Sequence, residues 1–235
     1  MKLNKIGVAA TIGMAAVIAM ASPAAAQDRE PSGFRAAVTG GTLGIGPEVG
    51  YRVNETIGTR ANATFFSIDA TADSDDLEFD GNVRLRSFGL MADIHPFGGG
   101  FRISPGFRIN NNRATAVGLP NAGSTYEIDG NVYTADEIGT LSAETDIKKF
   151  APSLTIGYGG GNRRGFVFGA EAGVLFQGSV GIKPLEITGV CASPSSSPDC
   201  ATIAADLESE RVAVEEDIDQ YKIYPILQLS VGYRF

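Results

Sequence analysis

The chain is poor in several residue types, and each shortage narrows the possibilities. Its 235 residues include no tryptophan, one histidine and two cysteines. No run of 18 apolar residues follows residue 26, so that part of the chain lacks a candidate membrane-spanning helix. Without residues 1–26, 17 Lys and Arg (19 minus Lys2 and Lys5) stand against 27 Asp and Glu, a net charge of −10. Nucleic acid is not expected as a partner, because phosphate binding needs clustered cations.

The first 26 residues have the pattern of a secretory signal peptide. Two lysines precede an apolar stretch from Ile6 to Met20, and three alanines end at residue 26. This is the basic, apolar and small-residue order that a signal peptidase recognises. We therefore expect a signal peptide at 1–26, a short lead at 27–32 and one domain over 33–235.

The final segment, 221–235, alternates between apolar side chains and polar or small ones. Because side chains point to opposite faces along a strand, this pattern predicts a strand with one apolar face. Thirty glycines also suit many short strands better than a helical core. The same alternation recurs in seven earlier segments: 34–39, 43–53, 57–69, 88–94, 101–110, 150–158 and 166–177.

The connections between these eight segments differ strongly in length. Short turns are expected at 54–56, 96–100 and 159–165, and a tight hairpin is expected at Gly40-Gly41-Thr42. Long connections are expected at 70–81, 111–147 and 178–220. Strands that run alternately up and down would bring all three long connections to one end of the sheet.

The chain ends in Val231-Gly232-Tyr233-Arg234-Phe235. With the alternation and the loop asymmetry, this ending resembles small outer-membrane β-barrel proteins of the OmpA-transmembrane and OmpW-like kind, over residues 33–235. The pattern and the resemblance imply an all-β fold, an eight-stranded antiparallel transmembrane β-barrel with long extracellular loops, one containing a short helix. Ten strands stay an alternative.

The resemblance also implies a location and partners. We expect the cell outer membrane, with contacts to outer-membrane lipid and lipopolysaccharide. Tyr233 and Phe235 resemble the terminal signal that the barrel-assembly machinery reads during biogenesis. The oligomeric state is left open.

The long connections contain three local signals. Asp129-Gly130 predicts a hairpin turn within 126–133. Ile203, Leu207, Val214, Ile218 and Tyr221 form one apolar stripe, which predicts a helix over 203–221 that packs against the barrel rim or the loops and exposes its acidic residues. A dedicated partner-binding helix is the alternative.

Cys191 and Cys200 lie close together in an exported chain. An oxidising compartment and an even count favour a disulfide between them. Closing so short a loop would stabilise it by about 2.5–3 kcal/mol. Their spacing matches no zinc site and no histidine is near, so we expect neither a metal site nor a cofactor.

Charged side chains recur on the polar faces of the predicted strands. An eight-stranded barrel has an interior only wide enough for side chains, and buried charges must pair there. We therefore expect Glu48, Asp93 and Glu171 to accept hydrogen bonds from arginines, with a proton or ion pathway as the alternative. The predicted lumenal network is Arg35, Glu48, Arg52, Arg60, Asp93, Arg102, Arg108, Glu171 and Arg234.

Arg84 and Arg86 are in phase with the outward Phe88 and Leu90. Either a bulge near Ser87 resets the phase, or these arginines lie above the membrane beside lipid A phosphates.

The sequence favours a non-enzymatic barrel with a plugged, charge-paired lumen and a structural or surface-binding role. A narrow channel for small solutes, including apolar ones, is the alternative. A lipid-modifying barrel enzyme is more remote, because such enzymes usually combine a histidine with a nearby serine or aspartate. Here His95 has Asp93 on its strand face, but no serine is near in sequence.

Overall fold

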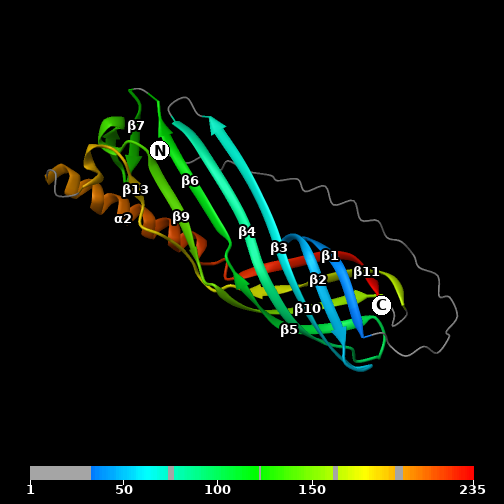
Figure 1. The fold of residues 1–235 in the computed structure, drawn as a ribbon. Coiled ribbons are helices and arrows are strands. Elements are labelled where there is room, and N and C mark those ends of the chain that lie inside the picture. The colour runs from blue at the N-terminus through cyan, green and yellow to red at the C-terminus, as the bar shows by residue number, and fades with distance from the viewer. Residues whose placement is uncertain (1–32, 74–76, 122, 161–163, 194–197) are drawn as a thin grey trace.

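The computed structural model describes residues 33–73, 77–121, 123–160, 164–193 and 198–235 (Figure 1). Eight strands form a closed antiparallel ring, which confirms the predicted fold and the count of eight. Pairing of the first with the last strand, and of β4 with β5, closes it. In ring order the strands are β1 (Phe34–Gly41), β2 (Gly44–Arg52), β3 (Ile57–Asp73), β4 (Leu77–Ile94), β5 (Phe101–Asn110), β10 (Phe150–Gly159), β11 (Gly165–Phe176) and β14 (Ile223–Arg234).

The predicted signal peptide at 1–26 and the lead at 27–32 lie outside the described residues. Within the described ranges, no helix has the length and apolar character needed to cross a membrane.

The barrel is apolar outside and polar over most of its interior, the reverse of a water-soluble protein. On β10, for example, the side chain of Ile156 is 54% exposed, whereas its neighbour Thr155 is 2% exposed. The same alternation holds on β14, where Leu229 faces out and Gln228 faces in. Large apolar side chains on the outside of a closed sheet are typical of barrels whose strands contact lipid.

β3 and β4 continue far beyond the ring as a sheet extension (Figure 1). Their pairing runs without a break from Ile57 opposite Ile94 to Asp73 opposite Glu78. The prediction of a long loop at 70–81 is therefore wrong, because most of these residues belong to the two strands. Its alanines, threonines and aspartates carry a weak strand signal, and the partner strand decides their conformation.

Much of the predicted 111–147 connection also belongs to this extension. β6 (Arg113–Pro120) pairs with β4, and β9 (Leu141–Ile147) pairs with β6. Two short strands, β12 (Val180–Ile182) and β13 (Glu186–Ile187), pair with β9. Within the described residues, the three predicted long connections are therefore largely strands and helices, and only parts of them are irregular.

The uninterrupted register of β3 with β4 shows no bulge near Ser87. Arg86 lies opposite Phe65, and Arg84 lies opposite Ser67. Both arginines are exposed on the outward face, and the guanidinium of Arg86 lies 5.9 Å from the ring centre of Phe65.

Gly40-Gly41-Thr42 does not itself form the first hairpin turn. Gly41 pairs with Gly44, so the turn consists of Thr42 and Leu43. Gly44 has a φ of +96°, a backbone conformation that favours glycine. Leu43, which the alternation placed on the outward row, is instead 3% exposed and lies inside.

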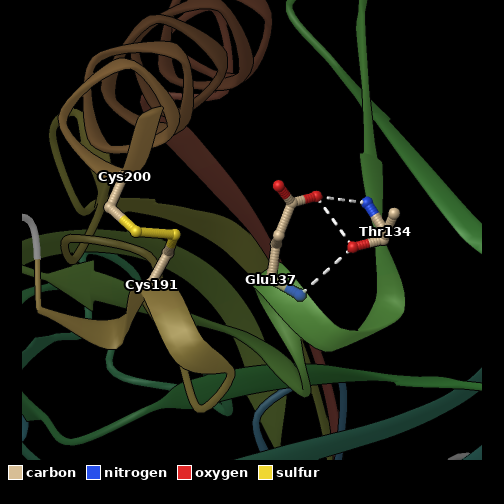
Figure 2. Close-up of a disulfide and its surroundings, with 4 residues drawn as sticks. All are labelled: Thr134, Glu137, Cys191 and Cys200. Atoms are coloured by element: carbon tan, nitrogen blue, oxygen red, sulfur yellow. Dashed lines mark hydrogen bonds between the residues drawn. A yellow bond between two sulfur atoms is a disulfide. The ribbon is translucent and has the colours of Figure 1, made fainter. Parts of the chain in front are cut away.

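A small subdomain lies at the edge of the extension (Figure 1). The predicted hairpin is confirmed as β7 (Thr125–Ile128) and β8 (Asn131–Thr134). Asp129 and Gly130 have φ values of +49° and +77°, as a two-residue hairpin turn requires. The short helix α1 (Ala135–Ile138) follows, and Thr134 and Glu137 form a reciprocal capping box at its start (Figure 2).

The disulfide between Cys191 and Cys200 is confirmed (Figure 2). It joins the short helix η1 (Val190–Ala192) to α2 (Pro198–Ile218), with Cα atoms 4.9 Å apart. Both cysteines are buried with Ile203 and Leu207 in the core of the subdomain. The disulfide therefore anchors the amino-terminal end of α2.

The predicted helix boundaries need correction, because α2 begins before 203 and ends before Tyr221. The predicted stripe is buried only in part. Ile203 and Leu207 are buried, whereas Val214 is 37% exposed and Tyr221 is 62% exposed. The second half of α2 lies beside β12, where Glu215 Oε1 accepts a hydrogen bond from the Ile182 N–H at 2.7 Å.

Candidate functional site in the barrel interior

All nine residues of the predicted network lie inside the barrel, and their side chains are largely shielded from solvent. We call the end at which β1 begins and β14 ends the terminal end, and the opposite end the loop end. The residues are spread from the terminal end past the middle of the lumen, on seven of the eight strands: Arg35, Glu48, Arg52, Arg60, Asp93, Arg102, Arg108, Glu171 and Arg234.

Arg60 lies at the centre of the network and contacts all three carboxylates. Its Nη1 is 3.0 Å from Glu48 Oε2, and its Nε is 3.2 Å from Asp93 Oδ2. Its Nη2 is 2.5 Å from Glu171 Oε2. These carboxylates come from β2, β4 and β11, so a single guanidinium on β3 connects opposite walls of the barrel. The side chain of Arg60 is 3% exposed.

Two further arginines complete the pairing of the carboxylates. Arg35 forms a salt bridge with Glu48. Arg102 Nη2 is 3.1 Å from Glu171 Oε2, and its Nε is 3.9 Å from Asp93 Oδ1. Each carboxylate therefore contacts at least two guanidiniums, which offsets the desolvation of the buried charges.

Neutral polar groups donate further hydrogen bonds to carboxylate oxygens that also contact Arg60. Ser104 Oγ donates to Asp93 Oδ1 at 2.6 Å, and Asn62 Nδ2 donates to Glu48 Oε2 at 3.3 Å. Sequence reasoning named the charges but missed these neutral partners. Ser104 and Asn62 lie on the same polar faces of their strands as the charged residues, and this position could have identified them.

Arg108 lies in a separate layer nearer the loop end and has neutral partners. It donates to Ser87 Oγ at 2.9 Å and to Thr64 Oγ1 at 3.2 Å. A Cβ atom on Gly89 would lie 2.6 Å from Nη1 of Arg108, so a larger residue at that position on β4 would displace the guanidinium from its present place. The expected pairing with carboxylates thus involves Arg35, Arg60 and Arg102. One serine and one threonine hydroxyl accept the hydrogen bonds of Arg108 instead.

The last two predicted residues lie at the terminal end. Arg52 donates to the backbone carbonyls of Asn54, Gly98 and Gly99, at 3.2, 2.9 and 3.2 Å. It thereby fastens two short turns to the barrel. Arg234 faces the interior, and neither its Nε nor its Nη1 has a hydrogen-bond partner among the described atoms.

An apolar cluster that sequence reasoning missed fills the interior at the loop end. It consists of Leu43, Ala151, Leu175 and Ile226, all at most 3% exposed, with Tyr224 packed against them. Tyr224 Oη donates to Thr42 O at 2.5 Å and so ties this cluster to the first hairpin. Ile226 on the otherwise polar row of β14 was the signal for it.

His95 lies in the turn after β4, at the terminal end of the barrel. Its Nδ1 is 3.0 Å from the carbonyl oxygen of Phe101, and burial lowers the pKa of His95 below its usual value. Asp93 is bonded to Ser104 and to arginines. Across the described ranges, no group of three or more His, Cys, Asp or Glu side chains could hold a metal ion.

The inverted surface and the strand pairing define a closed, eight-stranded antiparallel barrel with a charged interior. The chain is similar to two solved structures from Acinetobacter baumannii. To CarO2 it is 18% identical with a TM-score of 0.50, over 89% of this chain and 100% of that chain. To CarO it is 18% identical with a TM-score of 0.49, over 87% of this chain and 98% of that chain. At this identity the likeness concerns the fold. No protein-family model and no curated protein sequence matches the chain.

Proposed function

We propose that the protein is a non-enzymatic integral outer-membrane β-barrel whose paired interior charges close the lumen. The observation that carries the proposal is the contact of Arg60 with three carboxylates on three other strands. These side chains occupy the middle of the interior, where a channel of eight strands would need open space. Opening the lumen would separate several buried ion pairs.

The outer surface supports a membrane location. Exposed aromatic side chains form one band around the terminal end: Phe34, Tyr51, Phe97, Tyr158, Phe166 and Phe235. A second group lies nearer the loop end: Phe65, Phe88, Phe150 and Phe176. Two aromatic bands that flank an apolar zone are typical of barrels at the two interfaces of a bilayer. The terminal end would then face the periplasm, because barrels of this class keep short turns on that side.

This arrangement supports a structural or surface-binding role. The sheet extension and the disulfide-bonded subdomain would project outward from the cell. The exposed acidic residues of α2 include Glu208, Glu210, Glu216 and Asp217. They would meet divalent cations bound by lipopolysaccharide or an external partner.

A solute-flux assay separates this proposal from a narrow channel. The purified protein, inserted in liposomes that contain a sugar polymer, should give no more swelling than empty liposomes in sugars, amino acids or small apolar solutes. Swelling that depends on the amount of inserted protein would favour the channel. A correctly folded state is checked in each sample by the different mobility of unheated and boiled protein in SDS.

A further inference from the structure

The interior of the barrel carries more positive than negative charge. Among the described residues, three carboxylates stand against six arginines: Arg35, Arg52, Arg60, Arg102, Arg108 and Arg234. The central pairing uses all three carboxylates, and its arginines are Arg35, Arg60 and Arg102. Arg234, which is outside this pairing, places part of the excess positive charge at the terminal end.

A small cavity lies at this place. Its volume is about 30 Å³, and its lining includes five arginines, one carboxylate and one histidine: Arg35, Arg52, Arg60, Arg102, Arg234, Asp93 and His95. A cavity of this size has room for roughly two water molecules. The lining is therefore basic on balance, because its one carboxylate, Asp93, already contacts Arg60 and Arg102. The small volume favours a compact occupant.

Arg234 points to the nature of the occupant. The residue is 7% exposed, yet its Nε and Nη1 have no hydrogen-bond partner among the described atoms. The Nε of Arg102, which lines the same cavity, also lacks one. Buried donors without partners are costly, and more so when they are charged.

The strand register adds a second unfavourable interaction at Arg234. Arg234 on β14 lies directly opposite Arg35 on β1. Like charges directly opposite each other destabilise a pair of strands. An anion between them would reverse the sign of this interaction and accept the unsatisfied hydrogen bonds.

We propose that this cavity binds one small inorganic anion of the size of chloride. Guanidiniums donate strongly to anions, and Arg234 and Arg102 supply free donors from two strands. The small volume favours a compact inorganic anion over a lipid phosphate or a bulky organic carboxylate. The site would hold the terminal end of β14 against β1, where the ring closes. This proposal goes beyond the proposed function and does not depend on whether the lumen conducts.

Thermal unfolding of the purified protein in detergent tests the proposal. Chloride replaces gluconate, a bulky anion, at constant ionic strength, and circular dichroism follows unfolding. The melting temperature of the wild type should rise with chloride, as binding to the folded state requires. Arg234→Gln should weaken the apparent chloride affinity by roughly tenfold or more. Arg84→Gln, which removes an exposed arginine from β4, should leave it unchanged.

Equal melting temperatures in chloride and gluconate would overturn the proposal, as would an unaltered chloride dependence in Arg234→Gln. Crystals of the wild type grown in bromide give a test that needs no variant. An anomalous peak within hydrogen-bond distance of Arg234 is expected. A cavity without such a peak, at a bromide concentration that saturates the thermal effect, would contradict the assignment.

Discussion

Arg60→Met should lower the free energy of unfolding by on the order of 3–5 kcal/mol, because it leaves buried carboxylates with too few cations. Methionine fills much of the same volume, so loss of charge and hydrogen bonds dominates the effect. Glu48, Asp93 and Glu171 would each lose a guanidinium contact. The measurement is urea-induced unfolding in detergent, followed by circular dichroism.

The matched control is Arg84→Met, which removes an arginine from the exposed outward face of β4. Surface substitutions of this kind usually change stability by at most about 0.5 kcal/mol. Similar losses for the two variants would show that Arg60 does not hold the interior together.

Phe235→Ala should reduce the amount of folded protein in the outer membrane several-fold. Phe235 closes the aromatic band at the terminal end, with its ring centre 5.2 Å from that of Tyr233 and 5.6 Å from that of Phe34. Its N–H also donates to Phe34 O at 3.1 Å. We expect the assembly machinery to read this residue together with Tyr233. The measurement is quantitative blotting of outer-membrane fractions, with unheated samples to count folded protein.

Phe166→Ala is the control for this experiment. Phe166 lies in the same aromatic band, is 81% exposed and contacts Tyr233 edge-on at 5.6 Å. It is not terminal, so its loss should cost aromatic contacts without removing the proposed signal. Equal membrane levels of the two variants would contradict a special role for Phe235.

Much of the barrel could be predicted from period-two alternation alone. Neighbouring residues such as Thr155 and Ile156 are easy to assign to the inner and outer faces. The lipid-facing position requires an apolar side chain, and the interior position favours a small or polar one. The inward position of the charged residues follows from the same rule. The extension of β3 and β4 could not be found this way. Ser67 and Ile68 are both exposed there. Because neither face of the extension is buried at this point, the sequence does not alternate between apolar and polar residues.

The pairing inside the lumen was less predictable. Which side chains meet across a barrel depends on strand tilt and shear, which local sequence does not encode. Arg108 therefore finds Ser87 and Thr64 instead of a carboxylate. The prediction for Leu43 was wrong for a local reason. Gly44, the first residue of β2, has a positive φ, and this interrupts the alternation between Leu43 and Ile45.

The conductance of the wild type in planar bilayers, compared with that of Glu171→Ala, tests the closed lumen most directly. Glu171 bridges Arg60 and Arg102, and its removal leaves these buried guanidiniums with fewer anions. We expect no steady conductance from the wild type. Glu171→Ala should be less heat-stable, with brief openings as water enters around the arginines. A large, stable conductance in the wild type that is unchanged in Glu171→Ala would contradict the account.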